Sequence, residues 1–233
     1  MLVKTKALII SVVKYKDTSL IVRCLTHSDG LKSYIVKGVY GSSKSRLHPS
    51  YFGLLTIVEI EAQHKNKGGL EYIKSLRPIL SCVGADINKT SQVFFLAEVL
   101  SLLLVENDNN GNLFDFLENR LTWFYTQGNN PDFYLHILAE LTQYVGFYPN
   151  VSSGDYFDLE QGVFLPYESL TTLDRADSDL FKKLFTQISY NNSKEFSRTE
   201  RAKLLDIILK YYAAHVDGFR KSKSLQVLKE VFH

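Results

Sequence analysis

Three cationic side chains stand within ten residues of one another, in a segment rich in glycine and serine. Lys37 precedes a glycine, and Lys44 and Arg46 follow it in the run Gly-Ser-Ser-Lys-Ser-Arg. Glycine and serine keep backbone amides and hydroxyls open, so this segment can contact phosphate groups alongside its charged side chains. Tyr34 and Tyr40 flank Lys37, and aromatic rings beside cations can stack on unpaired bases. These residue types suit the binding of a polyanion.

Positive charge extends over the whole N-terminal third of the chain. Residues 1–80 carry thirteen Lys and Arg against five Asp and Glu, a net charge of +8. Residues 81–233 carry 14 basic and 20 acidic side chains, a net charge of −6. A concentrated positive field raises the local concentration of polyanions and speeds their capture, so nucleic acid is the first partner to expect. Further candidate contacts in this basic region are Lys14, Lys16, Arg23, Lys65 and Lys67.

Residues suited to catalysis or to metal binding are scarce. The six histidines include no pair at i, i+4, the spacing that a helical zinc site needs. His136 shares a predicted helix face with Glu140 and Gln143, and we expect that face to be solvated. The sequence has no nucleophile elbow, P-loop or dinucleotide motif. We therefore expect a protein that is not an enzyme and that uses no metal and no cofactor.

Short strands separated by turns account for the basic region. Strands are predicted at Lys6–Lys14, Thr18–Thr26, Leu31–Tyr40, Leu54–Gln63 and Leu70–Leu76. Gly30 provides the turn before the third strand, and Arg77-Pro78 is expected to end the fifth. Five short strands in about 75 residues suit a small closed barrel, because closure removes exposed sheet edges.

From Thr90 onward the apolar period becomes helical. The predicted helices begin at Thr90 or Ser91, Asn112, Pro131, Asp177, Ser197 and Ser224. The first should bury the stripe Phe94, Ala97, Leu100 and Leu104. Glu200 stands three residues after Ser197, the spacing of a capping box.

An irregular stretch at 147–169 interrupts these helices. It should hold a hairpin with strands at Tyr156–Leu159 and Val163–Leu165 around a turn at Gly162. Together the patterns predict an α+β chain. A basic barrel covers residues 1–80, and an acidic, mainly helical domain with the hairpin insertion covers residues 81–233.

Membrane insertion and disulfide formation are not expected. The longest apolar run, Phe94–Val105, is interrupted by Glu98 and is too short to span a bilayer. Cys24 and Cys82 lack the C-x-x-C spacing of a thiolate zinc site. We therefore expect reduced thiols, a cytoplasmic location and no membrane partner.

Short segments along the entire chain match the pattern of a known family. They are Lys4-Thr5-Lys6-Ala7, Asp17-Thr18-Ser19-Leu20, Gly30-Leu31, Lys37-Gly38, Lys44-Ser45-Arg46-Leu47, Glu140-Leu141, Gly146-Phe147-Tyr148-Pro149 and the closing Ser-Leu-Gln-Val-Leu-Lys-Glu of residues 224–230. In order and spacing the chain resembles the RecO family of bacterial recombination mediators. That resemblance implies an N-terminal OB-fold followed by a helical domain.

The resemblance also implies activity and partners. Family members bind single- and double-stranded DNA and anneal complementary strands. With their partner RecR they help load recombinase onto DNA coated by single-strand-binding protein, whose C-terminal tail they contact. Such a protein would associate with the nucleoid. An acidic, hydrophobic-ended tail suits an apolar groove bordered by cations, and the candidates in the helical domain are Lys203, Lys210, Arg220, Lys221 and Lys223.

The sequence departs from the family pattern at two places. Many members carry two zinc-binding cysteine pairs after the Gly-Tyr-x-Pro segment, whereas this chain reads Asn-Val-Ser-Ser-Gly-Asp at 150–155. The hairpin should therefore be held by packing of Tyr156, Phe157, Val163 and Phe164. Members also often place an arginine soon after the Lys-Gly pair, where this chain has Tyr40-Gly41. Compared with those members, this chain is therefore expected to lack one phosphate contact.

Two other functions fit the same composition. An RNA-binding OB-fold protein of the translation apparatus would need the same barrel and charge. An assembly adaptor would use its lysines for solubility alone. Competition between DNA and RNA oligonucleotides of one sequence would separate the first of these from a DNA-binding protein.

Overall fold

The structure is a computed structural model. It describes residues 1–40, 47–65, 68–82, 87–105, 111–128, 130–188, 190–191, 193–219, 224–225, 228 and 230. The chain forms two compact units, Met1–Gln127 and Gly128–His233.

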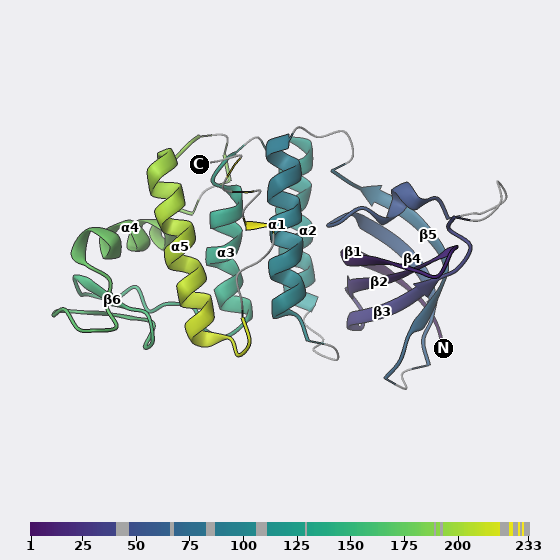
Figure 1. The fold of residues 1–233 in the computed structure, drawn as a ribbon, viewed down its shortest axis with the longest axis horizontal. Coiled ribbons are helices and arrows are strands. Elements are labelled where there is room, and N and C mark those ends of the chain that lie inside the picture. The colour runs from purple at the N-terminus through teal and green to yellow at the C-terminus, as the bar shows by residue number, and fades with distance from the viewer. Residues whose placement is uncertain are drawn as a thin grey trace. The chain divides into compact units, whose positions relative to one another are not determined.

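The first unit contains a strand barrel and two long helices (Figure 1). Its elements are β1 (Leu2–Tyr15), β2 (Ser19–Thr26), β3 (Gly30–Val36), the short 3-10 helix η1 (Pro49–Phe52), β4 (Ile57–Gln63), β5 (Glu71–Leu80), α1 (Ile87–Leu103) and α2 (Gly111–Thr126). The second unit contains α3 (Phe133–Tyr144), the hairpin strands β6 (Tyr156–Asp158) and β7 (Val163–Leu165), α4 (Arg175–Thr186) and α5 (Arg198–His215). This order confirms the expected α+β class.

The five strands close in the order β1-β2-β3-β5-β4. The first part of β1 pairs with β4 and its last part pairs with β2, with a register shift between Ile9 and Ser11 that bends the strand. Parallel pairing of β3 with β5, at Tyr34↔Glu71 and Ile35↔Tyr72, completes the circle. A five-stranded Greek-key barrel of this order is an OB-fold.

Alternate residues of each strand fill the barrel. Ile9, Val22, Tyr34, Ile60 and Ile73 are among the side chains that lie in one buried cluster. The hydroxyl of Tyr34 is 2.8 Å from His64 Nε2, which lies just beyond β4. The Lys65 amide donates to Glu71 Oε2 at 2.7 Å, next to the short β3–β5 contact. These bonds satisfy polar groups inside the barrel where closure depends on few strand pairs.

Side chains tie α1 and α2 to the barrel and to each other. Arg23 of β2 donates to Ser101 Oγ of α1 at 3.0 Å. Tyr125 of α2 donates to the Leu55 carbonyl at 3.0 Å, and Lys89 of α1 donates to the Phe124 carbonyl at 2.8 Å. The compact N-terminal unit therefore extends beyond the barrel and includes both helices.

A buried ionic group organises the second unit. Asp132, fully buried before α3, accepts from the Glu195 amide at 2.7 Å and lies 3.3 Å from Arg201 Nη1 of α5. Arg201 also donates to the Phe196 carbonyl at 2.7 Å. These contacts fix the segment between α4 and α5 against two helices. His136 is fully buried beside Glu195, so the solvated face expected for it was wrong.

Several expected boundaries differ from the structure. β3 ends at Val36 and β4 begins only at Ile57, because Leu55 adopts a φ of 51° in the turn before it. β5 continues through Pro78 to Leu80 instead of ending at Arg77-Pro78. Pro78 pairs with Val58 beside a register shift, an irregular position that tolerates a missing N–H.

The helix starts also differ. α1 begins at Ile87, so Thr90 and Ser91 lie inside it and do not cap it. Phe94, expected in the buried stripe, is 52% exposed. α4 begins at Arg175, where Asp174 caps it by accepting from the Asp177 amide. The last expected helix, from Ser224, falls largely outside the described residues. Among the described residues no helix is both long and apolar enough to cross a membrane.

The hydroxyl of Tyr34 should contribute measurably to barrel stability. Replacing Tyr34 with Phe keeps the ring but leaves His64 Nε2 buried without that hydrogen bond, and we expect a loss of about 1–3 kcal/mol in the free energy of unfolding. Urea titration monitored by circular dichroism measures this loss in the free energy of unfolding. Tyr40→Phe is the matched control, because this ring is 49% exposed. Equal stability of the two variants would contradict the role given to Tyr34.

The capping box of α5 should make stability depend on pH. The Ser197 amide donates to Glu200 Oε2 at 2.7 Å, and this bond lowers the pKa of Glu200 from its usual 4.5. A carboxylate with a lowered pKa stabilises the fold above its unfolded-state pKa, and this contribution is lost as pH falls through the folded-state pKa. We expect Glu200→Gln to lower the free energy of unfolding by about 0.3–1 kcal/mol at pH 7, and by less as the pH falls. Glu160→Gln, at an exposed carboxylate, should show no such trend; a pH-independent cost for Glu200→Gln would contradict this account.

Candidate nucleic-acid interface

Three of the predicted cations meet at one end of the barrel. Lys14 pairs with Leu20, and Leu20 pairs with Val36, so the end of β1, the start of β2 and the end of β3 lie together. Lys14 stands on β1, Lys16 in the turn after it, and Lys37 directly after β3. We call these three residues the rim cations.

Aromatic rings accompany the rim cations. Lys14 Nζ lies 5.5 Å from the ring centre of Tyr40, whose amide donates to the Thr18 carbonyl at 3.4 Å. Lys16 Nζ lies 5.4 Å from the ring centre of Tyr15. Cation–π contact at these distances holds each ammonium group over a ring without neutralising its charge. Tyr15 was not predicted as a site residue, although its place directly before Lys16 was visible in the sequence.

The rim cations differ from the other basic residues of the barrel in their partners. Across β1, β4 and β5, Lys4 and Arg77 lie 3.4 and 3.6 Å from Glu59, and Lys74 lies 3.4 Å from Glu61. Lys6 pairs with Glu118 of α2 at 2.8 Å. Within the described chain, no carboxylate forms an ion pair with a rim cation. The rim cations therefore keep their charge available for a ligand.

The other predicted DNA-binding residues are not part of the rim. Tyr34 lies in the barrel core, where burial raises the pKa of its hydroxyl and leaves no ring face for a base. The guanidinium of Arg23 is bonded to α1. Lys65 is exposed after β4. Lys44, Arg46 and Lys67 lie outside the described residues.

The predicted partner-binding residues of the helical domain are not brought together by the described structure. Lys203 is paired with Asp177 of α4 at 2.6 Å, and this hydrogen bond raises its pKa. Lys210 is exposed on α5. Arg220, Lys221 and Lys223 lie outside the described residues.

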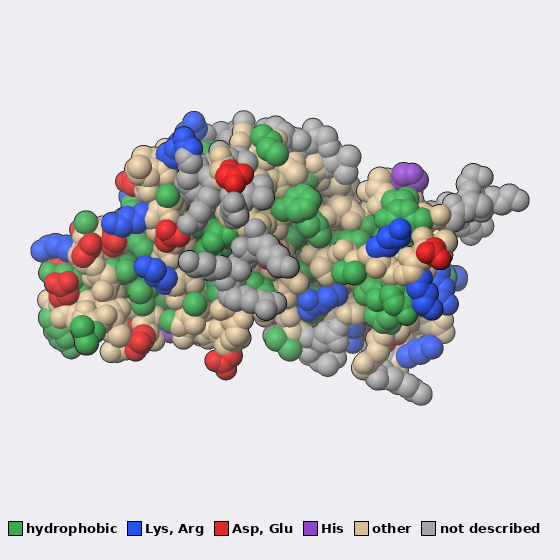
Figure 2. Space-filling model, viewed as in Figure 1, with side chains coloured by type: hydrophobic (Ala, Val, Ile, Leu, Met, Phe, Trp, Pro, Cys, Tyr) green, Lys and Arg blue, Asp and Glu red, His purple; other side chains and the backbone are tan. Residues whose placement is uncertain are grey.

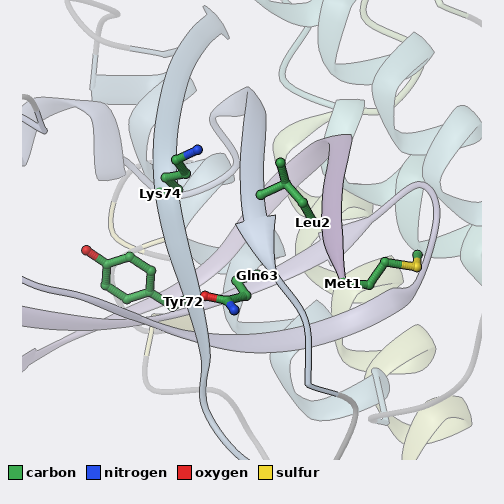
Figure 3. A pocket seen from close by; sticks show the side chains of 5 residues that line it. All are labelled: Met1, Leu2, Gln63, Tyr72 and Lys74. Carbon is green, nitrogen blue, oxygen red and sulfur yellow. The ribbon is translucent and has the colours of Figure 1, made fainter.

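Charged side chains of both signs lie over the helices at the left of Figure 2. In Figure 2 Lys and Arg side chains lie among hydrophobic ones over the barrel, at the right of the view. Figure 3 shows the side chains that line a hollow on the barrel: Met1, Leu2, Gln63, Tyr72 and Lys74. This hollow was not predicted from the sequence.

Packing and carboxylate hydrogen bonds hold the hairpin around Gly162. Phe157 is fully buried, and its ring centre lies 4.6 Å from that of Phe181 and 4.9 Å from that of Phe164. Burial acts to raise the pKa of Asp158, but bonds from the Thr171 hydroxyl and from the amides of Gln161 and Glu160 outweigh it and lower that pKa. Within the described residues no three His, Cys, Asp or Glu side chains gather as a metal site would require.

These features define a nucleic-acid-binding class of protein, an OB-fold barrel with a cationic, aromatic rim joined to a helical region. Comparison with known proteins is more specific. The family model described as recombination protein O N terminal matches residues 1–82, and the model for its C terminal matches residues 84–224. The chain belongs to the RecO family of DNA repair and recombination proteins.

Relatives named DNA repair protein RecO match over their full length. The protein of Flavobacterium psychrophilum is 43% identical over 238 residues, and that of Flavobacterium johnsoniae is 43% identical over 236 residues. The protein of Bacteroides fragilis is 34% identical over 243 residues. Each alignment covers all of this chain and all of the relative.

We predict that the purified protein carries no structural zinc. The physical reason is that Phe157 and Asp158 already fix the hairpin where the family often places cysteine pairs. Elemental analysis should give far less than one zinc per chain, and a strong chelator should leave the thermal unfolding midpoint unchanged. One zinc per chain, or unfolding on chelation, would overturn this prediction.

Proposed function

We propose that this protein is a non-enzymatic mediator of DNA repair and recombination that binds single- and double-stranded DNA and anneals complementary strands. The observation that carries the proposal is the group of rim cations. All three are exposed and unpaired with carboxylates in the described structure, and Lys14 and Lys16 lie beside the rings of Tyr40 and Tyr15. OB-folds bind oligonucleotides on the face of strands 2 and 3 and on the β1–β2 and β4–β5 loops. Lys16 and Lys65 stand in these two connections.

The proposed mechanism of annealing is charge neutralisation. Two DNA strands repel each other, and ammonium groups that replace condensed counterions lower the free-energy cost of bringing them together. Phosphate contacts carry no base information, so the edges of the bases stay free to pair. The ion pairs across β1, β4 and β5 leave that part of the barrel closer to neutral, which favours binding at the rim.

We further propose a division of labour and the protein partners. DNA binding belongs to residues 1–80, and the helical domain, residues 81–233, binds proteins. With RecR, the protein would help load recombinase onto DNA coated by single-strand-binding protein, and it would contact the acidic tail of that protein. These roles imply work at the bacterial nucleoid, in the cytoplasm. They are supported by membership of the RecO family and by the acidic balance of residues 81–233.

A strand-annealing assay on DNA coated with the cognate single-strand-binding protein tests the whole proposal. We expect the full-length protein to speed annealing of complementary oligonucleotides, and RNA of the same sequence to compete poorly. Absence of any acceleration, with folded protein and verified coating, would refute the annealing role. Stronger competition by RNA would favour an RNA-binding function instead.

The cations after β3 should contribute through phosphate contacts. For single strands the slope of log affinity against log salt is about −0.7 per phosphate, so replacing Lys37, Lys44 and Arg46 together with Ala should flatten it by roughly 2. Binding should weaken evenly across sequences, because these contacts carry no base readout. Titration of a fluorescent oligonucleotide at several salt concentrations measures both effects.

The matched control removes the same charge elsewhere on the barrel. Lys4, Lys6 and Arg77 are ion-paired with carboxylates, and their joint replacement with Ala changes the net charge equally. We expect a much smaller change of slope. Equal effects of the two triple variants would mean that net charge alone matters and that the segment after β3 is a simple connector.

A further inference from the structure

A row of outward-facing side chains crosses four strands of the barrel. By strand register Val13 of β1 pairs with Ile21 of β2, Ile21 pairs with Ile35 of β3, and Ile35 pairs with Tyr72 of β5. Directly paired residues point to the same face of a sheet. The neighbours of these residues along the strands, such as Val22 and Tyr34, point into the core. The row therefore lies on the outside of the barrel.

Both ends of this row are open to solvent. Val13 is 59% exposed and Tyr72 is 41% exposed, while Ile21 and Ile35 are half-buried. Two residues after Val13, on the same face of β1, Tyr15 is 38% exposed. At the other end Tyr72 lines the hollow of Figure 3. Neighbouring strands lie about 4.8 Å apart, so the path from Val13 to Tyr72 along the curved surface of the barrel is about 14 Å.

The two tyrosines of this face differ from the tyrosines that serve the fold. Tyr34, Tyr125 and Tyr212 are buried or half-buried, and each uses its hydroxyl in a hydrogen bond to another element. Tyr72 has neither a hydrogen bond from its hydroxyl nor a ring contact within the described residues. The ring of Tyr15 contacts the ammonium group of Lys16. Neither ring is needed to close or fill the barrel.

The charges around the row favour an anionic occupant. Lys16 stands beside Tyr15, and Lys74 stands two residues after Tyr72 on the same face of β5. Lys65 is exposed in the β4–β5 connection. Of the described carboxylates, Asp17 lies in the β1–β2 turn, Glu61 lies 3.4 Å from Lys74, and Glu71, next to Tyr72, is buried and pairs with the core residue Tyr34. An apolar floor with a ring and cations at each end has the composition of a groove for unpaired nucleotides.

We propose that the row Val13–Ile21–Ile35–Tyr72, with Tyr15 beside it, is a stacking track that makes this protein prefer an unpaired strand to a duplex. The inference rests on the proposed DNA-binding function and assigns the preference to particular side chains. In a duplex both faces of each base are covered by stacking, so an exposed ring gains nothing there. Phosphates are present in both forms, so the rim cations bind both. The two tyrosines therefore discriminate, and the cations do not.

The test compares the affinities of full-length variants for two fluorescent DNA probes. The probes are a mixed-sequence single strand and a blunt hairpin duplex, measured by polarisation at several salt concentrations. Tyr72→Ala and Tyr15→Ala should each lower affinity for the single strand about 5- to 150-fold, the range that loss of one stacked base allows. Affinity for the duplex should stay within about twofold. The salt slope should not change, because no phosphate contact is lost.

Two further substitutions separate stacking from loss of apolar surface or of folding. Tyr72→Phe keeps the ring and should bind the single strand as the wild type does, whereas Tyr72→Leu should lose as much affinity as Tyr72→Ala. Tyr167→Ala is the control, since this tyrosine is 62% exposed in the other unit. It should affect neither probe.

The outcomes also separate this inference from the function on which it rests. The stacking track is refuted if the tyrosine variants bind both probes like the wild type, or if they lose affinity for both probes equally. The DNA-binding function still stands in that case, provided that replacing Lys37, Lys44 and Arg46 weakens both probes. If that triple variant also binds normally, the proposed function fails too. Retained DNA affinity with lost binding of a protein partner would identify the row as a protein-docking face and overturn the inference.

Discussion

The closure of the barrel between β3 and β5 is the constraint on which the rest of the N-terminal unit depends. The two strands pair at only two positions, and closure brings the start of β5 next to the end of β3. The Tyr34–His64 bond and the bond from the Lys65 amide to Glu71 strengthen this narrow contact from inside. Without closure, β3 and β5 would expose their edges, and Ile35 and Tyr72 would not lie side by side.

The same barrel uses its basic residues in two opposite ways. Across β1, β4 and β5 they alternate with glutamates and form ion pairs that are individually weak at an exposed surface. At the rim Lys14 and Lys16 lie over tyrosine rings, which hold a cation without cancelling its charge. The net charge of the region does not show this difference. Affinity for a polyanion depends on the basic side chains that have no carboxylate partner, and the fold decides where those side chains lie.

Local patterns in the sequence predicted what local physics controls. The capping box of Ser197 and Glu200 is present as expected, and Gly162 adopts a φ of 68° in the predicted hairpin turn. The helical and strand regions follow from apolar periodicity. Each of these features is decided within a few residues, by a hydrogen bond or by a backbone angle that favours glycine.

Features that depend on distant partners could not be predicted in this way. Nothing near Pro78 indicates that β5 passes through it beside a shift in the β4 ladder. His136 is buried against Tyr190, Glu195 and Phe196, which lie far along the chain. The exposed row from Val13 to Tyr72 arises from the register of four strands, and no segment of the sequence contains it. Sequence therefore indicated the basic rim, while the aromatic face beside it required the fold.

The hairpin around Gly162 also bears on the chemistry of damaged cells. Zinc held by thiolates is released when oxidants attack the sulfur ligands. In this protein the same region is fixed by Phe157, Phe164 and Phe181 and by the carboxylate of Asp158. None of these side chains contains sulfur. Residues 147–169 contain neither cysteine nor methionine, so peroxide has no sulfur to oxidise in this region. The packing of Phe157 and the hydrogen bonds of Asp158 therefore do not depend on the oxidation state of any cysteine.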